Sequence, residues 1–209
     1  MDEFLRRLGE PTPAPGGGAA SAAVAIIANS LVSMVAGLSI NKKGNEKNAE
    51  MISEIIRSIP LRRSELDSLM KLDEEAFQEI VKAWRLPKDT PENLKLRSEK
   101  IEAAAKKAIE VPWKIASVSA SILDDAVMLA RYGLRSAITD SGCAGEFARS
   151  SIYGVIQNIR INLLSVHDKE YVENQMLKIK LFTQDVEEMY KEMNNEIETY
   201  LSKQRSKNA

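Results

Sequence analysis

Two aspartates stand where the surrounding sequence could give a carboxylate an unusual environment. Asp73 opens the stretch DEEAF, and Asp140 opens the stretch DSGCAG. An acidic run on a helix is usually a solvated surface, but a carboxylate beside an apolar face can be buried. Its pKa is then raised, as general acid–base catalysis requires. Asp140 lies beside small residues that leave room for a ligand, with helix capping as its alternative role. Both are candidates for proton transfer.

Three consecutive glycines, Gly16, Gly17 and Gly18, stand directly before an Ala-rich segment. Free backbone N–H groups at such a helix start, together with the helix dipole, can hold an anion or a polar carbonyl. The run is neither a Walker loop nor a dinucleotide fingerprint, because no strand precedes it and no Gly-Lys-Ser/Thr follows. A flexible turn between two helices is the alternative interpretation.

Two carboxamides recur in the run NIRINL, where Asn158 and Asn162 are four residues apart. That spacing places both on one face of a helix. Buried amides need hydrogen-bond partners, so these either tie helices together or bind a ligand. Arg160 points away from them on an ideal helix. We expect it to line another wall of a binding site, such as a wall formed across a dimer.

Cations stand at the end of the Ala-rich segment and after the Leu-Pro-Lys turn. Lys42 and Lys43 follow a stretch without charge, and Arg97 and Lys100 come later. Such residues could hold the carboxylates of an acidic ligand. Complementing a helix dipole and solvating the surface are their ordinary roles.

The composition excludes several classes of protein. The chain has 209 residues, a formal net charge of −1 and 5% aromatic residues, which argues against nucleic-acid binding. Cys143 and His167 are the only residues of their types, so an intrachain disulfide is impossible and a structural zinc site lacks its usual ligands. A lone thiol fits a reducing compartment, and no secretory signal is visible, so we expect a cytoplasmic protein.

One segment resembles a membrane span, because residues 11–41 carry no charge. Residues 19–40 are long enough to cross a bilayer. They are rich in Ala, Ser and Gly and have no aromatic anchors. We therefore expect a helix buried on all sides in a soluble bundle, and no membrane partner.

Apolar residues recur at three- and four-residue steps through most of the chain, and no segment alternates with period two. Helices are expected from Asp2 to Gly9, over residues 19–40, 52–84, 90–128, from Thr139 or Asp140 to about 166, and over 169–202. Pro60 should kink or split its helix, and a second kink is expected at Pro112. The prediction is a single all-α domain over residues 1–209, an elongated bundle without significant β-sheet. The long apolar seam of the last helix indicates coiled-coil-like pairing within the bundle or across a dimer.

Together these motifs resemble the cyclodeaminase domain of the formiminotransferase-cyclodeaminase family and its stand-alone relatives, the methenyltetrahydrofolate cyclohydrolases. The resemblance rests on PAPGGGAA, the uncharged helix ending in KK, and then DEEAF, LPK, Arg97, VP, TD and NIRINL in the family's order. It extends to about Asp168. Ala19 stands where the family usually has Ser after the glycines, and Thr139 stands for a Ser.

The resemblance implies an all-helical homodimer that binds a tetrahydrofolate derivative near its subunit interface. The enzyme would form 5,10-methenyltetrahydrofolate from 5-formiminotetrahydrofolate with release of ammonia, or hydrolyse 5,10-methenyltetrahydrofolate to 10-formyltetrahydrofolate. Acid–base catalysis without metal suits both reactions. Asp73 and Asp140 would be catalytic, and the folate would be bound by Gly16, Gly17, Gly18, Lys42, Lys43, Arg97, Asn158, Arg160 and Asn162. A non-catalytic folate-binding protein or a helical scaffold is the alternative.

Overall fold

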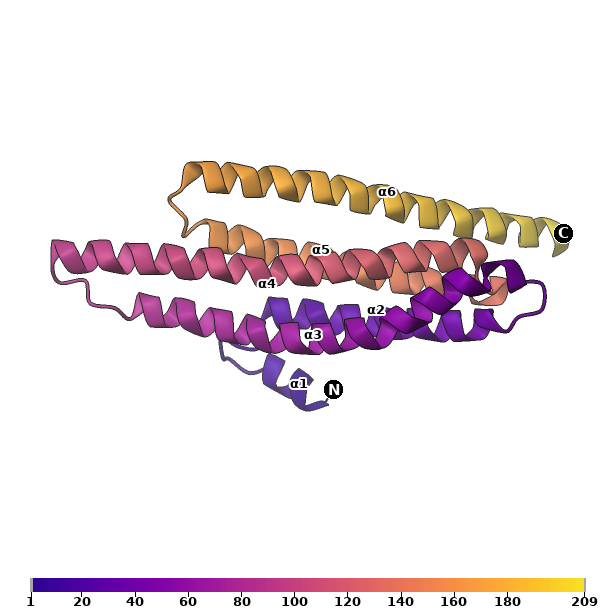
Figure 1. The fold of residues 1–209 in the computed structure, drawn as a ribbon, viewed down its shortest axis with the longest axis horizontal. Helices are drawn as coiled ribbons and strands as arrows, with labels where there is room; N and C mark the ends of the chain where they lie inside the picture. The colour runs from indigo at the N-terminus through magenta and orange to yellow at the C-terminus, as the bar shows by residue number, and fades with distance from the viewer. Residues whose placement is uncertain (1, 209) are drawn as a thin grey trace.

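The computed structural model describes residues 2–208, which form an elongated bundle of long helices (Figure 1). This described range contains α1 (Asp2–Leu8), α2 (Gly17–Ile40), α3 (Ala49–Trp84), α4 (Pro91–Tyr132), α5 (Ile138–Leu163) and α6 (Lys169–Asn208). No strand occurs between residues 2 and 208. The predicted all-α fold class is confirmed.

α2 packs against α3, α4 and α5. Five of its alanines have no exposed surface, namely Ala19, Ala22, Ala25, Ala28 and Ala36. Side chains this small allow neighbouring helices to approach closely. By length and composition α2 could also cross a membrane, but 50% of its most apolar stretch is buried inside the bundle. One side of α2 is buried, as its small residues predict. The other side is exposed, with Ile27, Met34 and Leu38 at 41%, 43% and 51%, so the expectation of a helix buried on all sides was wrong.

α3 and α4 form a long hairpin whose tip extends past the N-terminal end of α2 (Figure 1). The Oγ1 atom of Thr90 accepts a hydrogen bond from Asn93 N–H at 3.1 Å, which confirms the predicted start of α4. Pro60 does not split its helix, because α3 runs unbroken through that residue, and α4 likewise runs unbroken through Pro112. Packing against neighbouring helices outweighs the one backbone hydrogen bond that each proline removes.

The start of α5 differs from the prediction. A short 3-10 turn, η2 (Arg135–Ala137), leads directly into the helix, which begins at Ile138 with Ala137 in the capping position. Neither Thr139 nor Asp140 caps α5, so that prediction was wrong. Ser39 of α2 instead holds the turn that precedes α5, because its hydroxyl accepts a hydrogen bond from the Leu134 N–H at 2.8 Å. The chain is therefore already helical when it reaches residue 139.

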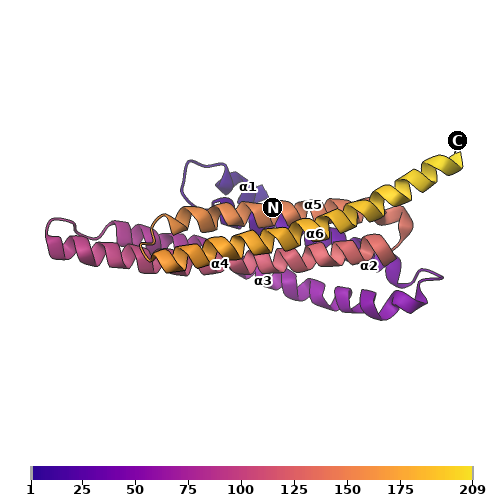
Figure 2. The same ribbon diagram turned by 90° about the horizontal axis from the view of Figure 1, so that it is seen from above.

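α6 lies along α4 and α5 and continues past the end of the bundle at its C-terminus (Figure 2). Its buried residues Ile179, Val186 and Met193 are seven positions apart, the repeat of a coiled-coil seam. Polar contacts flank this seam, among them Arg149–Glu187 at 2.7 Å. The predicted coiled-coil-like pairing is therefore found within the bundle.

A buried ion pair joins α3 to the last turns of α4. The side chains of Arg62 and Asp125 are only 14% and 12% exposed and are in direct contact. Burial raises the pKa of Asp125, and the Arg62 guanidinium opposes that shift. The pair is satisfied as long as both partners are present.

Arg62→Met should destabilise the fold by about 3 kcal/mol near pH 7, because it leaves the Asp125 carboxylate buried without a counter-charge. The loss should shrink as the pH falls and Asp125 becomes protonated. The double change Arg62→Met/Asp125→Leu should recover most of it. Urea unfolding followed by circular dichroism measures all three proteins. A single variant as stable as the parent at pH 7 would contradict this account.

Candidate functional site

A cavity of about 410 Å³ lies at the N-terminal end of α2, between α3 and the end of α5. Its size is within the range of small-molecule sites. Its lining residues come from four segments that are far apart in sequence: Pro13, Ala14, Gly16, Gly17, Gly18, Asp73, Glu74, Ala76, Phe77, Ile80, Trp84, Ala108, Asn158, Ile161, Asn162, Leu164 and Ser165. Two of these are carboxylates and none is Lys or Arg.

Asp73 lies against the first turn of α2. One oxygen of its carboxylate, Oδ2, accepts a hydrogen bond from the Ala19 N–H at 3.1 Å. The first N–H groups of a helix have no partner within the helix, and the dipole there favours a negative charge. Gly18 makes this approach possible, because a Cβ at that position would overlap the carboxyl group of Asp73.

Burial raises the pKa of Asp73 and is the largest influence on it. The hydrogen bond from Ala19 lowers the pKa, and the neighbouring Glu74 carboxylate raises it. Burial therefore outweighs the helix N–H, and the carboxyl group holds a proton more readily than an exposed aspartate does. A group poised in this way can accept and return protons nearer to neutral pH.

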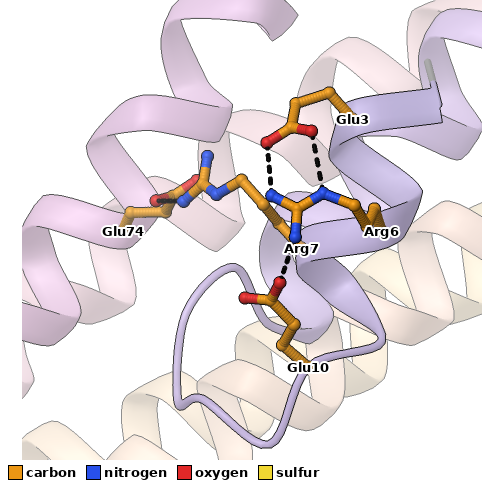
Figure 3. Close-up of polar contacts among 5 residues, drawn as sticks. All are labelled: Glu3, Arg6, Arg7, Glu10 and Glu74. Carbon is orange, nitrogen blue, oxygen red and sulfur yellow. Dashed lines mark hydrogen bonds and ion pairs between the residues drawn. The ribbon is translucent and has the colours of Figure 1, made fainter.

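Glu74 is tied to the N-terminal helix. Arg7 of α1 contacts the Glu74 carboxylate at 2.8 Å, while Arg6 pairs with Glu3 at 2.8 Å and also with Glu10 (Figure 3). α1 has no buried residue, and of these contacts only Arg7–Glu74 joins it to another helix. The tether holds the loop that follows α1, and with it the cavity residues Pro13 and Ala14, in place over the site.

The two carboxamides of α5 form another wall of the cavity. Asn158 lies beside Gly17, where a Cβ would be 3.5 Å from its Oδ1 atom. Its Nδ2 is buried and has no hydrogen-bond partner. Leaving a buried donor unpaired costs about 1–3 kcal/mol. An acceptor on a bound ligand would remove that cost, so the wall is suited to a ligand with a polar edge.

Two aromatic side chains of α3 also line the cavity. Phe77 and Trp84 pack edge to face with ring centroids 6.3 Å apart, and Trp84 is 47% exposed. Neither was among the predicted site residues. Their helical spacing could have identified them. Residues 73, 77, 80 and 84 are separated by four, three and four positions, which places Phe77 and Trp84 on the same helix face as Asp73.

The remaining predicted residues lie outside this cavity. Lys42 and Lys43 line a second cavity of about 510 Å³ at the C-terminal end of α2. The intervening helix is about 36 Å long. Asp140 is half-buried in the first turn of α5, at the far end of that helix from Asn158. Arg97 donates to the backbone carbonyl of Trp84 at 3.1 Å and so stabilises the α3–α4 turn, and Arg160 is exposed.

Among the described residues, 2–208, no three side chains of His, Cys, Asp or Glu come together as a metal site would require. The cavity instead combines two carboxylates, two carboxamides and two aromatic rings. Such a set can bind a flat, polar-edged ring and transfer protons beside it.

Comparison with known proteins decides the family. Residues 1–180 match the family described as formiminotransferase-cyclodeaminase. The chain belongs to this family. It is 32% identical over 181 residues to the methenyltetrahydrofolate cyclohydrolase of Methylorubrum extorquens, with 86% of each chain covered. It is 28% identical over 182 residues to the formimidoyltransferase-cyclodeaminase of Mus musculus, of which it spans 34%.

The fold agrees with a solved structure of the same family. The chain superposes on formiminotetrahydrofolate cyclodeaminase from Thermotoga maritima with a TM-score of 0.87 and 25% sequence identity, and 96% of both chains is covered. The superposition covers most of the chain beyond residue 180, where the family match ends. The resemblance drawn from the sequence motifs is confirmed.

The pKa of Asp73 gives a prediction for stability. Because folding raises this pKa, the contribution of Asp73 to stability is present at low pH and is lost as the pH rises through the folded value. Asp73→Asn keeps an acceptor for Ala19 N–H but removes the buried charge. The variant should therefore unfold at a higher temperature than the parent at pH 8, with a much smaller difference at pH 4.

Thermal unfolding across this pH range measures the effect, with Asp185→Asn on the exposed face of α6 as the matched charge control. The control should follow the parent at each pH. If the unfolding temperatures of the parent and of Asp73→Asn differed by the same amount at pH 4 and pH 8, Asp73 would not be the source of the pH dependence.

Proposed function

We propose that this protein catalyses acid–base chemistry at the one-carbon bridge of a tetrahydrofolate, either forming 5,10-methenyltetrahydrofolate or hydrolysing it. The observation that carries the proposal is a half-buried carboxylate, Asp73, in a cavity lined by acidic residues without any Lys or Arg. Both reactions pass through a positively charged one-carbon bridge. Acidic residues stabilise such a cation, and a basic lining would repel it.

One carboxyl group can carry out the proton transfers of either reaction. In cyclodeamination, N10 attacks the formimino carbon and loses its proton, and the amino group of the tetrahedral intermediate takes up a proton and leaves as ammonia. In hydrolysis, water adds to the methenyl carbon and loses one proton. The C–N5 bond then breaks as the added hydroxyl loses its proton to form the formyl group and N5 is protonated. Asp73 would accept the proton in one step and return it in the next.

The other cavity residues would hold the ring system. The unpaired amide of Asn158 and the amide of Asn162 would bind the polar edge of the pterin, and Phe77 and Trp84 would contact its face. Ser165 adds a hydroxyl at the rim. A relative named as a cyclohydrolase and a solved structure named as a cyclodeaminase are both similar to the chain, so the proposal keeps both activities.

The proposed enzyme is a homodimer, as the resemblance implies. Its ligand is a folate, with no nucleic acid or membrane as partner and no metal in the reaction. Because Asp73 lies in the cavity and Asp140 of the same chain does not, Asp73 is our candidate for proton transfer. Asp140, Lys42 and Lys43 can serve the same site only from another copy of the chain.

Asp73→Asn should lower kcat by about two to four orders of magnitude, because asparagine keeps the shape of the side chain but loses the basic oxygen. In the parent, kcat/KM should rise with pH through a pKa above the ordinary aspartate value of about 3.9, and the variant should lack this limb. The measurement is the absorbance of methenyltetrahydrofolate, followed with the formimino substrate and separately as hydrolysis.

Three outcomes separate the alternatives. Turnover that survives in the variant would place the proton transfer elsewhere. Folate binding without turnover in the parent would make the protein a binding module, and no thermal stabilisation by any reduced folate would make it a scaffold. Asp185→Asn controls for the loss of one negative charge.

A further inference from the structure

The two arginines of α1 point in different directions (Figure 3). Arg6 pairs with Glu3 and Glu10, which belong to α1 and to the loop after it. Arg7 instead reaches α3, where its Nη2 atom lies 2.8 Å from Oε2 of Glu74. Of these two adjacent cations, only Arg7 therefore contacts a residue that lines the cavity.

Glu74 is the charged neighbour of Asp73 in the cavity. Among residues 2–208, both carboxylates line this cavity and no other charged residue does. The elements around Asp73 otherwise present neutral groups, because α2 contains no charged residue and the cavity residues of α4, of α5 and of the loop after α1 carry no charge. The negative charge of Glu74 raises the pKa of Asp73. Whatever holds or neutralises Glu74 therefore acts on Asp73 as well.

The ion pair with Arg7 opposes the charge of Glu74. The side chains of Arg7 and Glu74 are 43% and 28% exposed, so water screens the pair only in part. With the pair formed, Arg7, Glu74 and an ionised Asp73 together carry one net negative charge. This charge matches the single positive charge of the one-carbon bridge that the proposed reactions pass through.

We infer that Arg7 is a positioning residue for Asp73. It holds Glu74 toward α1 and neutralises it, so that the cavity presents one uncompensated carboxylate to the ligand instead of two. The inference rests on the proposed function for the nature of the ligand and for the role of Asp73 in proton transfer. Arg7 also helps to hold Pro13 and Ala14 over the cavity, and a variant can affect activity through that loop alone. The tests below separate the two effects.

The pKa of Asp73 in the ligand-free protein tests the inference without an assay of activity. Carbon-13 NMR of the aspartate carboxyl carbons gives this pKa in a pH titration, and Asp73→Asn identifies the signal. Arg7→Gln should raise the pKa by about 0.5, because the charge of Glu74 is no longer opposed. Glu74→Gln should lower it, because that variant removes the anion and leaves the guanidinium. Arg7→Gln/Glu74→Gln, which removes both charges, should return close to the parent.

Two further variants separate the charge from a loosening of α1. Arg6→Gln removes the same charge one residue earlier and breaks the contacts to Glu3 and Glu10. It should leave the pKa of Asp73 unchanged, because those contacts do not reach the cavity. Arg7→Lys keeps the positive charge and should stay close to the parent. An Asp73 pKa that is the same in Arg7→Gln as in the parent would overturn the inference, and so would an equal rise in Arg6→Gln.

The pH dependence of turnover gives a second readout. Arg7→Gln should move the acidic limb of kcat/KM to higher pH, which lowers kcat/KM about threefold at a pH on that limb. A loss by the same factor at every pH would show that Arg7 only holds the loop, and it would overturn the inference.

Failure of the inference and failure of the proposed function give different results. If Arg7→Gln and Glu74→Gln leave the pKa of Asp73 unchanged while the wild-type protein turns over a folate, the inference fails and the proposed function stands. If the pKa moves as expected but the wild-type protein turns over neither folate, the proposed function fails. The effect of Arg7 on Asp73 would then stand as a property of the cavity.

Discussion

The close approach of α3 to the first turn of α2 determines what this bundle can do. Asp73 occupies the space that a side chain at residue 18 would fill, and it accepts its hydrogen bond from the helix N–H of Ala19. Every other part of the cavity is arranged around that contact. The α3–α4 hairpin extends beyond the N-terminal end of α2. The space before the first turn of α2 is enclosed by this hairpin and by the end of α5.

Asp125 is buried and Asp73 is half-buried, and the two carboxyl groups have different roles. Burial raises the pKa of both Asp73 and Asp125. Asp125 has the Arg62 guanidinium in contact and so joins two helices, whereas Asp73 has one backbone N–H and an adjacent carboxylate. A carboxylate with so little compensation destabilises the fold when ionised, and it is therefore suited to exchanging a proton with a ligand.

Much of this structure could be predicted from the sequence because its periodicity is strong and local. The spacing of apolar residues gave the helices, and Thr90-Pro91 fixed the start of α4. The unbroken course of α3 through Pro60 could not be predicted, since it depends on tertiary packing. The start of α5 also escaped prediction, because Ser39, nearly a hundred residues earlier, holds the preceding turn.

Local sequence motifs also predicted part of the site. Gly16 to Gly18, Asp73, Asn158 and Asn162 do line one cavity, although only the fold brings them together. Phe77 and Trp84 were missed because aromatic residues at helical spacing are usually core. Lys42 and Lys43 were placed in the same site by family resemblance, and within one chain the length of α2 keeps them apart.

The most direct test of the central claim compares Gly18→Ala with Gly17→Ala. Both changes add one methyl group to the first turn of α2, but only the methyl at residue 18 overlaps the Asp73 carboxyl group, whereas at residue 17 the nearest atom is 3.5 Å away. We expect Gly18→Ala to lower kcat by about a hundredfold through displacement of the carboxylate, and Gly17→Ala to remain near the parent, with both folded. Equal turnover in the two variants would show that the position of Asp73 against α2 does not determine catalysis.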